Sequence, residues 1–311
     1  MHNIRYLRVI LTRRCNLDCF YCHHEGNVDA GGSDIDYDFL CLAIRMLIGC
    51  GIKKVKFLGG EPTLYRHLSE IVRFARALDS QTDISMVSNG IVNEDVLGEV
   101  VEAGLQRVNI SLHGLNCHTF RRLTRGSEQQ LERILQTIAI LKKKGVLGKI
   151  NYLLLKGENE DEFLDVLRYV HEEDLVIDVL NYLSDKEPDI FRYYFTFTQI
   201  VSMISDRYPI ARREPHANRY SIDSERLYLS GGGTVNLKVN QLNEIDFLKS
   251  CDACDKSMFC KEGISAIRLT NTGWLKPCLF RDDNGLDLRR LIGEIGADAA
   301  SERLRDYLEN L

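Results

Sequence analysis

Short β-rich runs alternate with helical patterns over residues 1–183, and this alternation restricts the fold to a few architectures. Such alternation is typical of βα units that build a parallel sheet. Six units are too few to close an eight-stranded barrel, so we expect an α/β fold with a partial (βα)6 TIM-like barrel and an active site at the carboxyl ends of its strands. The strands are expected at Tyr6–Leu11, Lys54–Leu58, Asp83–Val87, Arg107–Leu112, Ile150–Leu155 and Val176–Leu180. Apolar stripes with helical spacing fall between them, around Leu40–Leu47, Leu131–Leu141 and Phe163–Val170.

After Leu183 the alternation stops, and we expect a C-terminal extension, residues 184–311, that packs on the barrel domain of residues 1–183. Asp189–Tyr208 is rich in aromatic residues and is predicted to be helical. Arg219–Val239 has the pattern of β-structure that turns at Gly231–Gly233. Because no helix follows these glycines, they indicate a turn and not a phosphate-binding loop. The tail Leu286–Leu311 is amphipathic.

Charge and hydropathy exclude several classes of function. Lys and Arg total 40 against 45 Asp and Glu, and the net charge of −5 argues against a nucleic-acid or membrane-surface binder. No apolar run reaches the length of a membrane span, and the N-terminus lacks the apolar core of a secretory signal. We therefore expect a cytoplasmic protein, in which the ten cysteines indicate metal or redox chemistry before disulfides. Cys41, Cys50 and Cys117 stand alone and are expected to pack as small apolar residues.

Cys15, Cys19 and Cys22 follow the first predicted strand with the spacing C-x3-C-x2-C. Three thiolates this close can ligate three irons of a 4Fe–4S cluster and leave the fourth iron open to a ligand. A structural zinc ion would need a fourth protein ligand, which His23 or His24 could supply. Tyr21 favours the cluster, because an aromatic ring beside the third cysteine can lie against a bound nucleoside.

Two lysines on the second strand point to an anionic ligand. Side chains alternate along a strand, so Val55 and Phe57 share one face while Lys54 and Lys56 share the other. The outer face of a barrel strand is covered by helices and is apolar, which turns both lysines inward. Two buried like charges are costly unless an anion meets them, so we expect a pocket for a polyphosphate. The alternative places both lysines at the solvent-exposed rim.

Four further cysteines, Cys251, Cys254, Cys260 and Cys278, cluster in the C-terminal extension. They are consistent with an added zinc ribbon or with a second iron–sulfur cluster. Because the first cysteine group already indicates an iron–sulfur cluster, a second cluster is the favoured interpretation.

The first cysteine group resembles that of the radical S-adenosylmethionine (SAM) superfamily. Gly59-Gly60-Glu61-Pro62 after the second strand is similar to the superfamily's GGEP element, and Ser88-Asn89-Gly90 and Ser111 end the next two strands. The resemblance implies that the open iron chelates SAM, and that reductive cleavage of SAM releases a 5′-deoxyadenosyl radical. It also implies an external electron donor such as flavodoxin or ferredoxin. Glu61 can pair with the SAM ammonium, and the glycines let the backbone approach a ligand closely.

Within that superfamily the chain resembles the GTP 3′,8-cyclase family over nearly its whole length. Segments that carry this resemblance include Ala103–Leu112, Lys149–Asn151 and Arg268–Phe280. The family has a SAM-binding cluster at one end of a partial barrel, a substrate-binding cluster at the other, and GTP between them. The resemblance implies SAM contacts from Tyr21, Gly59, Gly60, Glu61, Ser111 and Leu183. It implies GTP contacts from Arg8, Lys54, Lys56, Ser88, Lys149 and Arg268, and second-cluster ligands from Cys251, Cys254, Cys260 and Cys278.

Three departures from the family pattern keep an alternative open. Ala266 stands where the family has a second arginine, four cysteines replace three, and the tail ends without the family's paired glycines. A related radical SAM enzyme that modifies a peptide or another small molecule would share these features, with a fully ligated second cluster. A non-enzymatic zinc module is a third hypothesis, which the colour of the protein would test. The oligomeric state is not encoded in these patterns, which leaves a homodimer open.

Overall fold

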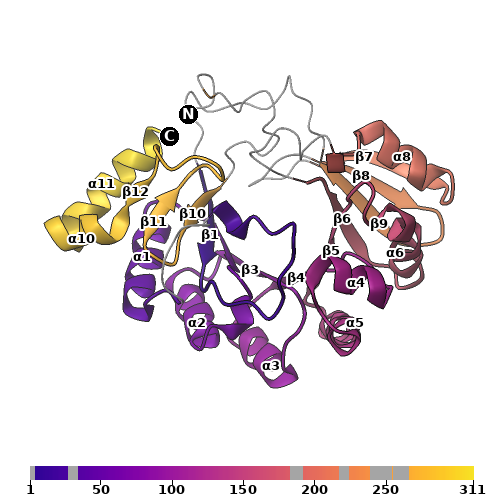
Figure 1. Cartoon of the computed structure of the whole chain (residues 1–311). Coiled ribbons are helices and arrows are strands. Elements are labelled where there is room, and N and C mark those ends of the chain that lie inside the picture. Colours follow the sequence, from indigo (N-terminus) through magenta and orange to yellow (C-terminus); the bar gives the residue numbers. More distant parts are fainter. Residues whose placement is uncertain (1–3, 27–33, 183–191, 217–223, 239–253, 255–265) are drawn as a thin grey trace.

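A single curved sheet of twelve strands organises the chain, in the order β12-β11-β10-β1-β2-β3-β4-β5-β6-β9-β8-β7. The computed structural model describes residues 4–26, 34–182, 192–216, 224–238, 254 and 266–311 (Figure 1). Eight neighbouring strands in the middle of the sheet run parallel, and the register shifts only between Val108 and Asn109 where β4 pairs with β5. Their bounds are β10 (Ile267–Leu269), β1 (Tyr6–Ile10), β2 (Lys54–Leu58), β3 (Asp83–Ser88), β4 (Arg107–Ser111), β5 (Leu147–Leu153), β6 (Val176–Leu180) and β9 (Thr234–Lys238).

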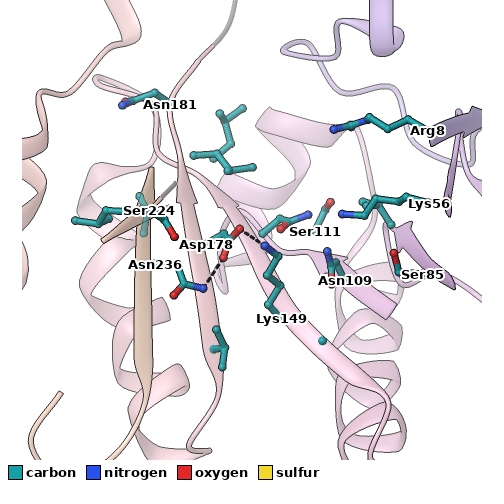
Figure 2. A pocket seen from close by; sticks show the side chains of 18 of the residues that line it. Arg8, Lys56, Ser85, Asn109, Ser111, Lys149, Asp178, Asn181, Ser224 and Asn236 are labelled. Atoms are coloured by element: carbon teal, nitrogen blue, oxygen red, sulfur yellow. Dashed lines mark hydrogen bonds and ion pairs between the residues drawn. The ribbon is translucent and has the colours of Figure 1, made fainter. Parts of the chain in front are cut away.

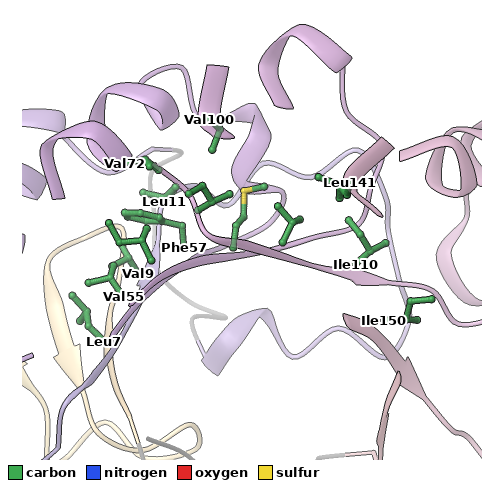
Figure 3. Close-up of a cluster of buried hydrophobic side chains, with 14 of the residues drawn as sticks. Leu7, Val9, Leu11, Val55, Phe57, Val72, Val100, Ile110, Leu141 and Ile150 are labelled. Atoms are coloured by element: carbon green, nitrogen blue, oxygen red, sulfur yellow. The ribbon is translucent and has the colours of Figure 1, made fainter. Parts of the chain in front are cut away.

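Helices cover the outer face of the arch and leave its inner face open (Figure 1). The outward side chains of successive strands form one apolar core with these helices, in which Val55 and Phe57 are fully buried (Figure 3). The helices between the strands are α1 (Tyr37–Gly49), α2 (Leu68–Leu78), α3 (Glu94–Glu102), α4 (Cys117–Thr124), α5 (Glu128–Lys143) and α6 (Glu160–Glu172). The three predicted apolar stripes lie on α1, α5 and α6, and each faces this core.

The open sheet confirms the predicted partial barrel, but its parallel part is wider than predicted. The added strands, β10 and β9, come from the C-terminal segment and pair with the two outermost barrel strands, β1 and β6. Neither lies in a βα repeat, so periodicity along the chain gave no signal for their position. Antiparallel strands β11 (Trp274–Lys276) and β12 (Leu286–Asp287) extend one edge, and β8 (Ser224–Leu229) and β7 (Ile210–His216) extend the other.

Strands β1, β3 and β4 end within one residue of prediction, and the larger differences are at β5 and α8. Strand β5 begins at Leu147, three residues before the predicted start, because Leu147 already pairs with Val108 of β4. Gly148 lies at the register shift between the two strands, where an added Cβ would come 2.5 Å from the Asn109 side-chain oxygen. The helix predicted over Asp189–Tyr208 is α8 (Phe197–Ser205), since Thr196 and Gln199 form a capping box that starts it there. The first residues of the predicted range lie outside the described residues.

The C-terminal segment follows the remaining predictions. The glycine turn joins β8 to β9, with Gly231, Gly232 and Gly233 all at positive φ. The amphipathic tail forms α10 (Leu288–Ile295) and α11 (Ala297–Glu309). Strands β9 and β10 tie this segment into the barrel sheet, while a division into domains at residue 183 stays a prediction. In the part of the chain that the structure describes, no helix has the length and apolarity to cross a membrane.

Candidate active site

The three-cysteine loop leaves the carboxyl end of β1 and is anchored on both sides. The backbone N–H groups of Asp18 and Phe20 donate to carbonyls of Thr124 and Leu123 in the last turn of α4, at 3.0 and 3.2 Å. The Asn89 side-chain amide, beyond the end of β3, lies 3.7 Å from the Cys15 sulfur. The loop is thereby fixed against elements that pack on the sheet.

The donor chemistry of this loop fits an iron–sulfur cluster. Cys15, Cys19 and Cys22 are all free thiols, and desolvation by the surrounding loop raises the pKa of each, that of Cys19 to about 12. Among the described residues, no three His, Cys, Asp or Glu side chains converge closely enough to hold a single metal ion. Three thiolates that each bind a different iron are spaced more widely than the ligands of one zinc ion. Three free thiols on one loop can hold three irons of such a cluster.

Gly59 and Gly60, predicted as SAM contacts, are required by the close approach of the cluster loop. The Gly60 N–H donates to the Thr12 carbonyl at 2.7 Å, and the Glu61 N–H donates to the Arg14 carbonyl at 2.8 Å. A Cβ on Gly60 would lie 2.2 Å from the Arg14 carbonyl oxygen, and one on Gly59 would lie 2.4 Å from that of Thr12. Both contacts are with backbone atoms, which cannot turn away as a side chain could. Gly59 also lines the central cavity described below.

The carboxylate of Glu61, which was predicted as a SAM contact, bonds to the ends of two strands. It is fully buried, and burial raises the pKa of its carboxyl group. One oxygen accepts from the Thr63 N–H, the Thr63 hydroxyl and the Ser88 hydroxyl, and the other accepts from the Asn89 N–H at 2.7 Å. The carboxylate thus ties the end of β2 to the end of β3. The structure brings neither Glu61 nor Ser88 to the wall of the cavity, although both were predicted as ligand contacts.

Gly60→Ala tests whether this close approach shapes the cluster loop. The added methyl must displace the Arg14 backbone, so we expect a loss of roughly 1–3 kcal/mol in stability and a fall in the iron bound after reconstitution. Gly98→Ala is the matched control, because a Cβ at this position in α3 would meet nothing within 4 Å. That variant should keep its iron and unfold at the same or a slightly higher temperature. Normal iron content in Gly60→Ala would contradict the assignment of these glycines to the loop.

One cavity of about 650 Å³ occupies the inner face of the sheet and reaches the cluster loop (Figure 2). At the carboxyl ends of the strands it is lined by Tyr21, Cys22 and His113, and at the amino ends by Tyr6, Asp83 and Arg107. Six of its lining residues are cationic and three carry a carboxylate. The cationic residues are Arg8, Lys54, Lys56, Arg107, Lys149 and Arg226; the acidic ones are Glu25, Asp83 and Asp178. The cavity is therefore suited to an anionic ligand.

Lys54 and Lys56 both line the cavity, which confirms that strand alternation turns them inward. Their ammonium groups lie over the ring of Tyr6, at 4.6 and 5.7 Å from its centroid. Desolvation, reinforced by the nearby charges of Arg8 and Lys149, lowers the pKa of Lys56 to about 7. Within the described residues no carboxylate lies in ion-pair range of Lys56. An anion in the cavity would restore the charged form of this side chain.

The other predicted cationic contacts divide into two groups. Lys149 lines the cavity and forms an ion pair with Asp178, while Arg8 lines it and pairs with Glu25 at 2.5 Å. Arg268 is only 3% exposed, lies behind the wall and faces the second oxygen of Glu25 at 3.5 Å. Burial alone would raise the pKa of Glu25. The nearby cations, Arg8 foremost, outweigh this effect and lower the pKa to about 2. Glu25 thus links two residues that were predicted to bind substrate separately.

Several lining residues were missed from the sequence. One guanidinium nitrogen of Arg107 donates to both carboxylate oxygens of Asp83, at 2.5 and 2.6 Å. The two residues begin the neighbouring strands β4 and β3. Asn109 and Ser111 follow Arg107 at intervals of two on β4, so all three project inward. Ser111 was predicted as a SAM contact. Arg107 and Asn109 were not, although strand alternation indicates their direction as it does for Lys54 and Lys56. Asn236 and Arg226 could not be predicted, because β8 and β9 were not expected in this sheet.

Tyr21 and Ser111, which were predicted to contact SAM, line the cavity. His113, which was not predicted, lines it beside Tyr21. The ring of His113 meets that of Tyr21 edge to face, with centroids 5.0 Å apart. Its Nδ1 accepts from the Leu153 N–H at 2.9 Å, and burial lowers its pKa to about 4. At neutral pH His113 is therefore uncharged, with its proton on Nε2. Leu183, the last predicted SAM contact, lies outside the described residues.

The second cysteine group is partly described. Cys251 and Cys260 lie outside the described residues, whereas Cys254 and Cys278 lie within them, and Cys254 contacts Arg281, which is close in sequence to Cys278. Lys276 pairs with Arg268 across β10 and β11, and Ile267 pairs with Leu7 of β1. Cys278 therefore lies toward the amino end of β1, whereas Cys15 follows its carboxyl end. Cys278 and Cys15 therefore lie toward opposite ends of β1.

Comparison with known proteins agrees with this geometry. The profile of the Radical SAM superfamily matches residues 9–170. A probable GTP 3′,8-cyclase of Methanocaldococcus jannaschii is 30% identical over 290 residues, which cover 92% of this chain and 88% of that protein. A probable GTP 3′,8-cyclase of Methanocella arvoryzae is 32% identical over 290 residues. This match covers 93% of this chain and 85% of that protein.

The fold is also found among solved structures. Streptococcus suis SuiB bound to the precursor peptide SuiA is similar over 89% of this chain, with a TM-score of 0.63. The sequence identity is 14% and the match spans 60% of SuiB, so this likeness concerns the fold alone. Superfamily membership implies a 4Fe–4S cluster and SAM, and the residues present at the β1 loop fit both. The chain is therefore an enzyme of the radical SAM superfamily whose curated relatives are named probable GTP 3′,8-cyclases.

Proposed function

We propose that this enzyme cleaves SAM to a 5′-deoxyadenosyl radical, which takes a hydrogen atom from the ribose of GTP. The product is the 3′,8-cyclised intermediate of molybdenum or tungsten cofactor synthesis. The observation that carries the proposal is one cavity that joins the three-cysteine loop to a cationic interior. The names of the relatives, at about 30% identity over most of the chain, support the same substrate.

The residues of the chain have separable tasks in this proposal. Cys15, Cys19 and Cys22 would hold the cluster, which would supply the single electron for SAM cleavage. A donor such as flavodoxin or ferredoxin would provide that electron. Tyr21 offers an aromatic face to a nucleoside, and the uncharged His113 beside it offers an N–H donor. Lys54 and Lys56, with Arg8 and Lys149, hold the triphosphate, and this positioning is where such an enzyme gains rate.

A second 4Fe–4S cluster on Cys251, Cys254, Cys260 and Cys278 belongs to the proposal. The position of Cys278 toward the amino end of β1 supports it, since a group bound there would face the cavity from the end opposite the SAM loop. Four ligands would leave this cluster without an open iron. Substrate would then be held by the cavity side chains alone.

An anaerobic assay of reconstituted protein with SAM, reductant and GTP tests the proposed reaction. We expect GTP to raise the yield of 5′-deoxyadenosine and to be consumed in step with it. ATP, which carries the same triphosphate, is the control and should raise the yield little. If SAM is cleaved slowly at the same rate with and without GTP, GTP is not the substrate. The radical SAM chemistry itself would still be supported by that result. The peptide-modifying alternative would then be tested next.

A further inference from the structure

A side-chain amide at the end of β3 reaches one of the three sulfurs of the cluster loop. The Asn89 Nδ2 group donates a hydrogen bond to the Cys15 Sγ atom at 3.7 Å. Hydrogen bonds to the ligand sulfurs are among the factors that set the potential of an iron–sulfur cluster. We infer that Asn89 is a positioning residue that raises the reduction potential of the cluster by acting through Cys15. The inference rests on SAM cleavage as part of the proposed function, and it does not depend on GTP as the substrate.

The orientation of the Asn89 amide is fixed by partners on both of its polar atoms. Its Oδ1 accepts from the Ile91 N–H at 2.9 Å, so Nδ2 is the atom that faces Cys15. One N–H of that group donates to the Asn16 Oδ1 at 2.6 Å, and the second N–H serves the sulfur. Asn16 is oriented in turn, because its own Nδ2 donates to the Ile91 carbonyl at 3.0 Å. Exchanging oxygen and nitrogen in the Asn89 amide would break both of its contacts within the protein.

The backbone of Asn89 is anchored as well as its side chain. Its N–H donates to one oxygen of the buried Glu61 carboxylate at 2.7 Å. The other oxygen of that carboxylate accepts from the Ser88 hydroxyl at 2.9 Å, at the last residue of β3. Asn89 thus connects the ends of β2 and β3 to the loop that follows β1. A donor that is fixed in this way needs no reorganisation when the charge at the sulfur changes.

The other two sulfurs are contacted from within the loop itself. The His24 Nδ1 atom lies 3.8 Å from the Cys22 Sγ atom, and the Tyr21 side chain contacts Cys19. Both of these residues belong to the segment that carries the cysteines. Asn89 lies on a different strand end, so a substitution there alters a sulfur contact without changing the sequence of the loop.

The sign of the effect follows from the charge that reduction adds. One electron enters the cluster, and no bond or proton at Asn89 changes. The added negative charge is shared with the ligand sulfurs, so an N–H donor aimed at one of them stabilises the reduced cluster more than the oxidised one. The Glu61 carboxylate interacts with the same cysteine and acts in the opposite direction. The amide offsets part of that charge and makes the cluster easier to reduce by a donor of the flavodoxin or ferredoxin class.

A redox titration of reconstituted protein, followed by EPR, tests the inference without SAM cleavage or GTP. Asn89→Asp keeps an oxygen for the Ile91 N–H and places a second oxygen, in place of the donor, at Cys15. At a fixed applied potential we expect the ratio of reduced to oxidised cluster to fall by at least roughly fivefold, the effect of one typical hydrogen bond. Fivefold corresponds to about 40 mV for a one-electron couple. The EPR signal that changes when SAM is added identifies the cluster of the β1 loop.

Asn93→Ala is the matched control. Asn93 is an exposed residue that caps α3 by accepting from the Asp95 N–H at 3.0 Å, so the variant loses an asparagine hydrogen bond away from the sulfurs. It should lower the unfolding temperature and leave the potential unchanged. An unaltered potential in Asn89→Asp, or an equal shift in Asn93→Ala, would overturn the inference and leave the proposed function standing. A wild-type cluster that titrates but never cleaves SAM would overturn the proposed function instead.

A measurement on the wild type decides the matter if Asn89→Asp loses its cluster. Protein labelled with nitrogen-15 only in the side-chain amides of asparagine should show a coupling between the reduced cluster and nitrogen-15 in pulsed EPR. The coupling should persist in Asn16→Asp, which removes the neighbouring amide nitrogen and keeps an acceptor for Asn89. Absence of the coupling in the wild type, or its loss in Asn16→Asp, would overturn the inference.

Discussion

Cys19→Ser is expected to lose the SAM-binding cluster and to reduce SAM cleavage to background. Iron in such clusters is held by cysteine thiolates, and a serine hydroxyl is a poor replacement at neutral pH. With two clusters per chain, the variant should lose about four irons and keep the rest. Iron content, the visible spectrum and 5′-deoxyadenosine release are the measurements.

Cys117→Ser is the control for that substitution. Cys117 is a free, exposed cysteine at the start of α4 and belongs to neither cysteine group. This variant should keep its iron and its activity. The loss of all iron in Cys19→Ser would speak against a second cluster, and a brown, active Cys19→Ser protein would refute the role of the loop.

Lys56→Met should change stability and binding in opposite directions. The lysine is partly buried among Arg8 and Lys149, and its pKa of about 7 shows that the charged form is disfavoured in the cavity. Removing the charge should stabilise the fold by roughly 1–3 kcal/mol, a range that allows for water in the cavity. Removing a cationic contact to phosphate should weaken GTP binding by roughly 10- to 100-fold. Thermal unfolding and calorimetry of reconstituted protein measure the two effects.

The stabilising effect has a defined pH window. The pKa of Lys56 is about 7 in the fold against 10.5 in the unfolded chain, so between these values the unfolded chain holds more protons. Wild-type stability should therefore rise with pH across this interval. The advantage of Lys56→Met should be complete below pH 7 and vanish toward pH 10.5. The restored charge also predicts that GTP binding near pH 7 takes up protons in the wild type and fewer in the variant.

Lys53→Met serves as the matched control. Lys53 precedes β2, is partly exposed outside the cavity and pairs with Asp79 at 3.2 Å. It should leave GTP affinity unchanged and alter stability by under about 1 kcal/mol. If Lys53→Met weakens binding as much as Lys56→Met, the effect is one of overall charge. The inward lysine would then have no special role.

Sequence periodicity predicted the six barrel strands, because each strand is a local run of β-forming residues bounded by turn signals. It also predicted the direction of the Lys54 and Lys56 side chains, since alternation along a strand is a local rule and the apolar Val55 and Phe57 identify the helix-covered face. The cysteine spacing indicated the cluster loop for the same reason. Its ligands lie within eight residues of one another and need no distant partner to be recognised.

Contacts between distant segments decided the rest. Asp178 accepts a hydrogen bond from Asn236 only because β9 joins β6 and brings the two side chains together. Arg268 and Arg8 share Glu25 only because β10 pairs with β1. The motif predicts Glu61 as a contact of the SAM ammonium, and folding surrounds its carboxylate with four donors from two strand ends. Residue type and spacing thus determine which chemistry is present in the chain. Only strand pairing across many residues determines which of those side chains still face the cavity, because each must first satisfy its partners inside the fold.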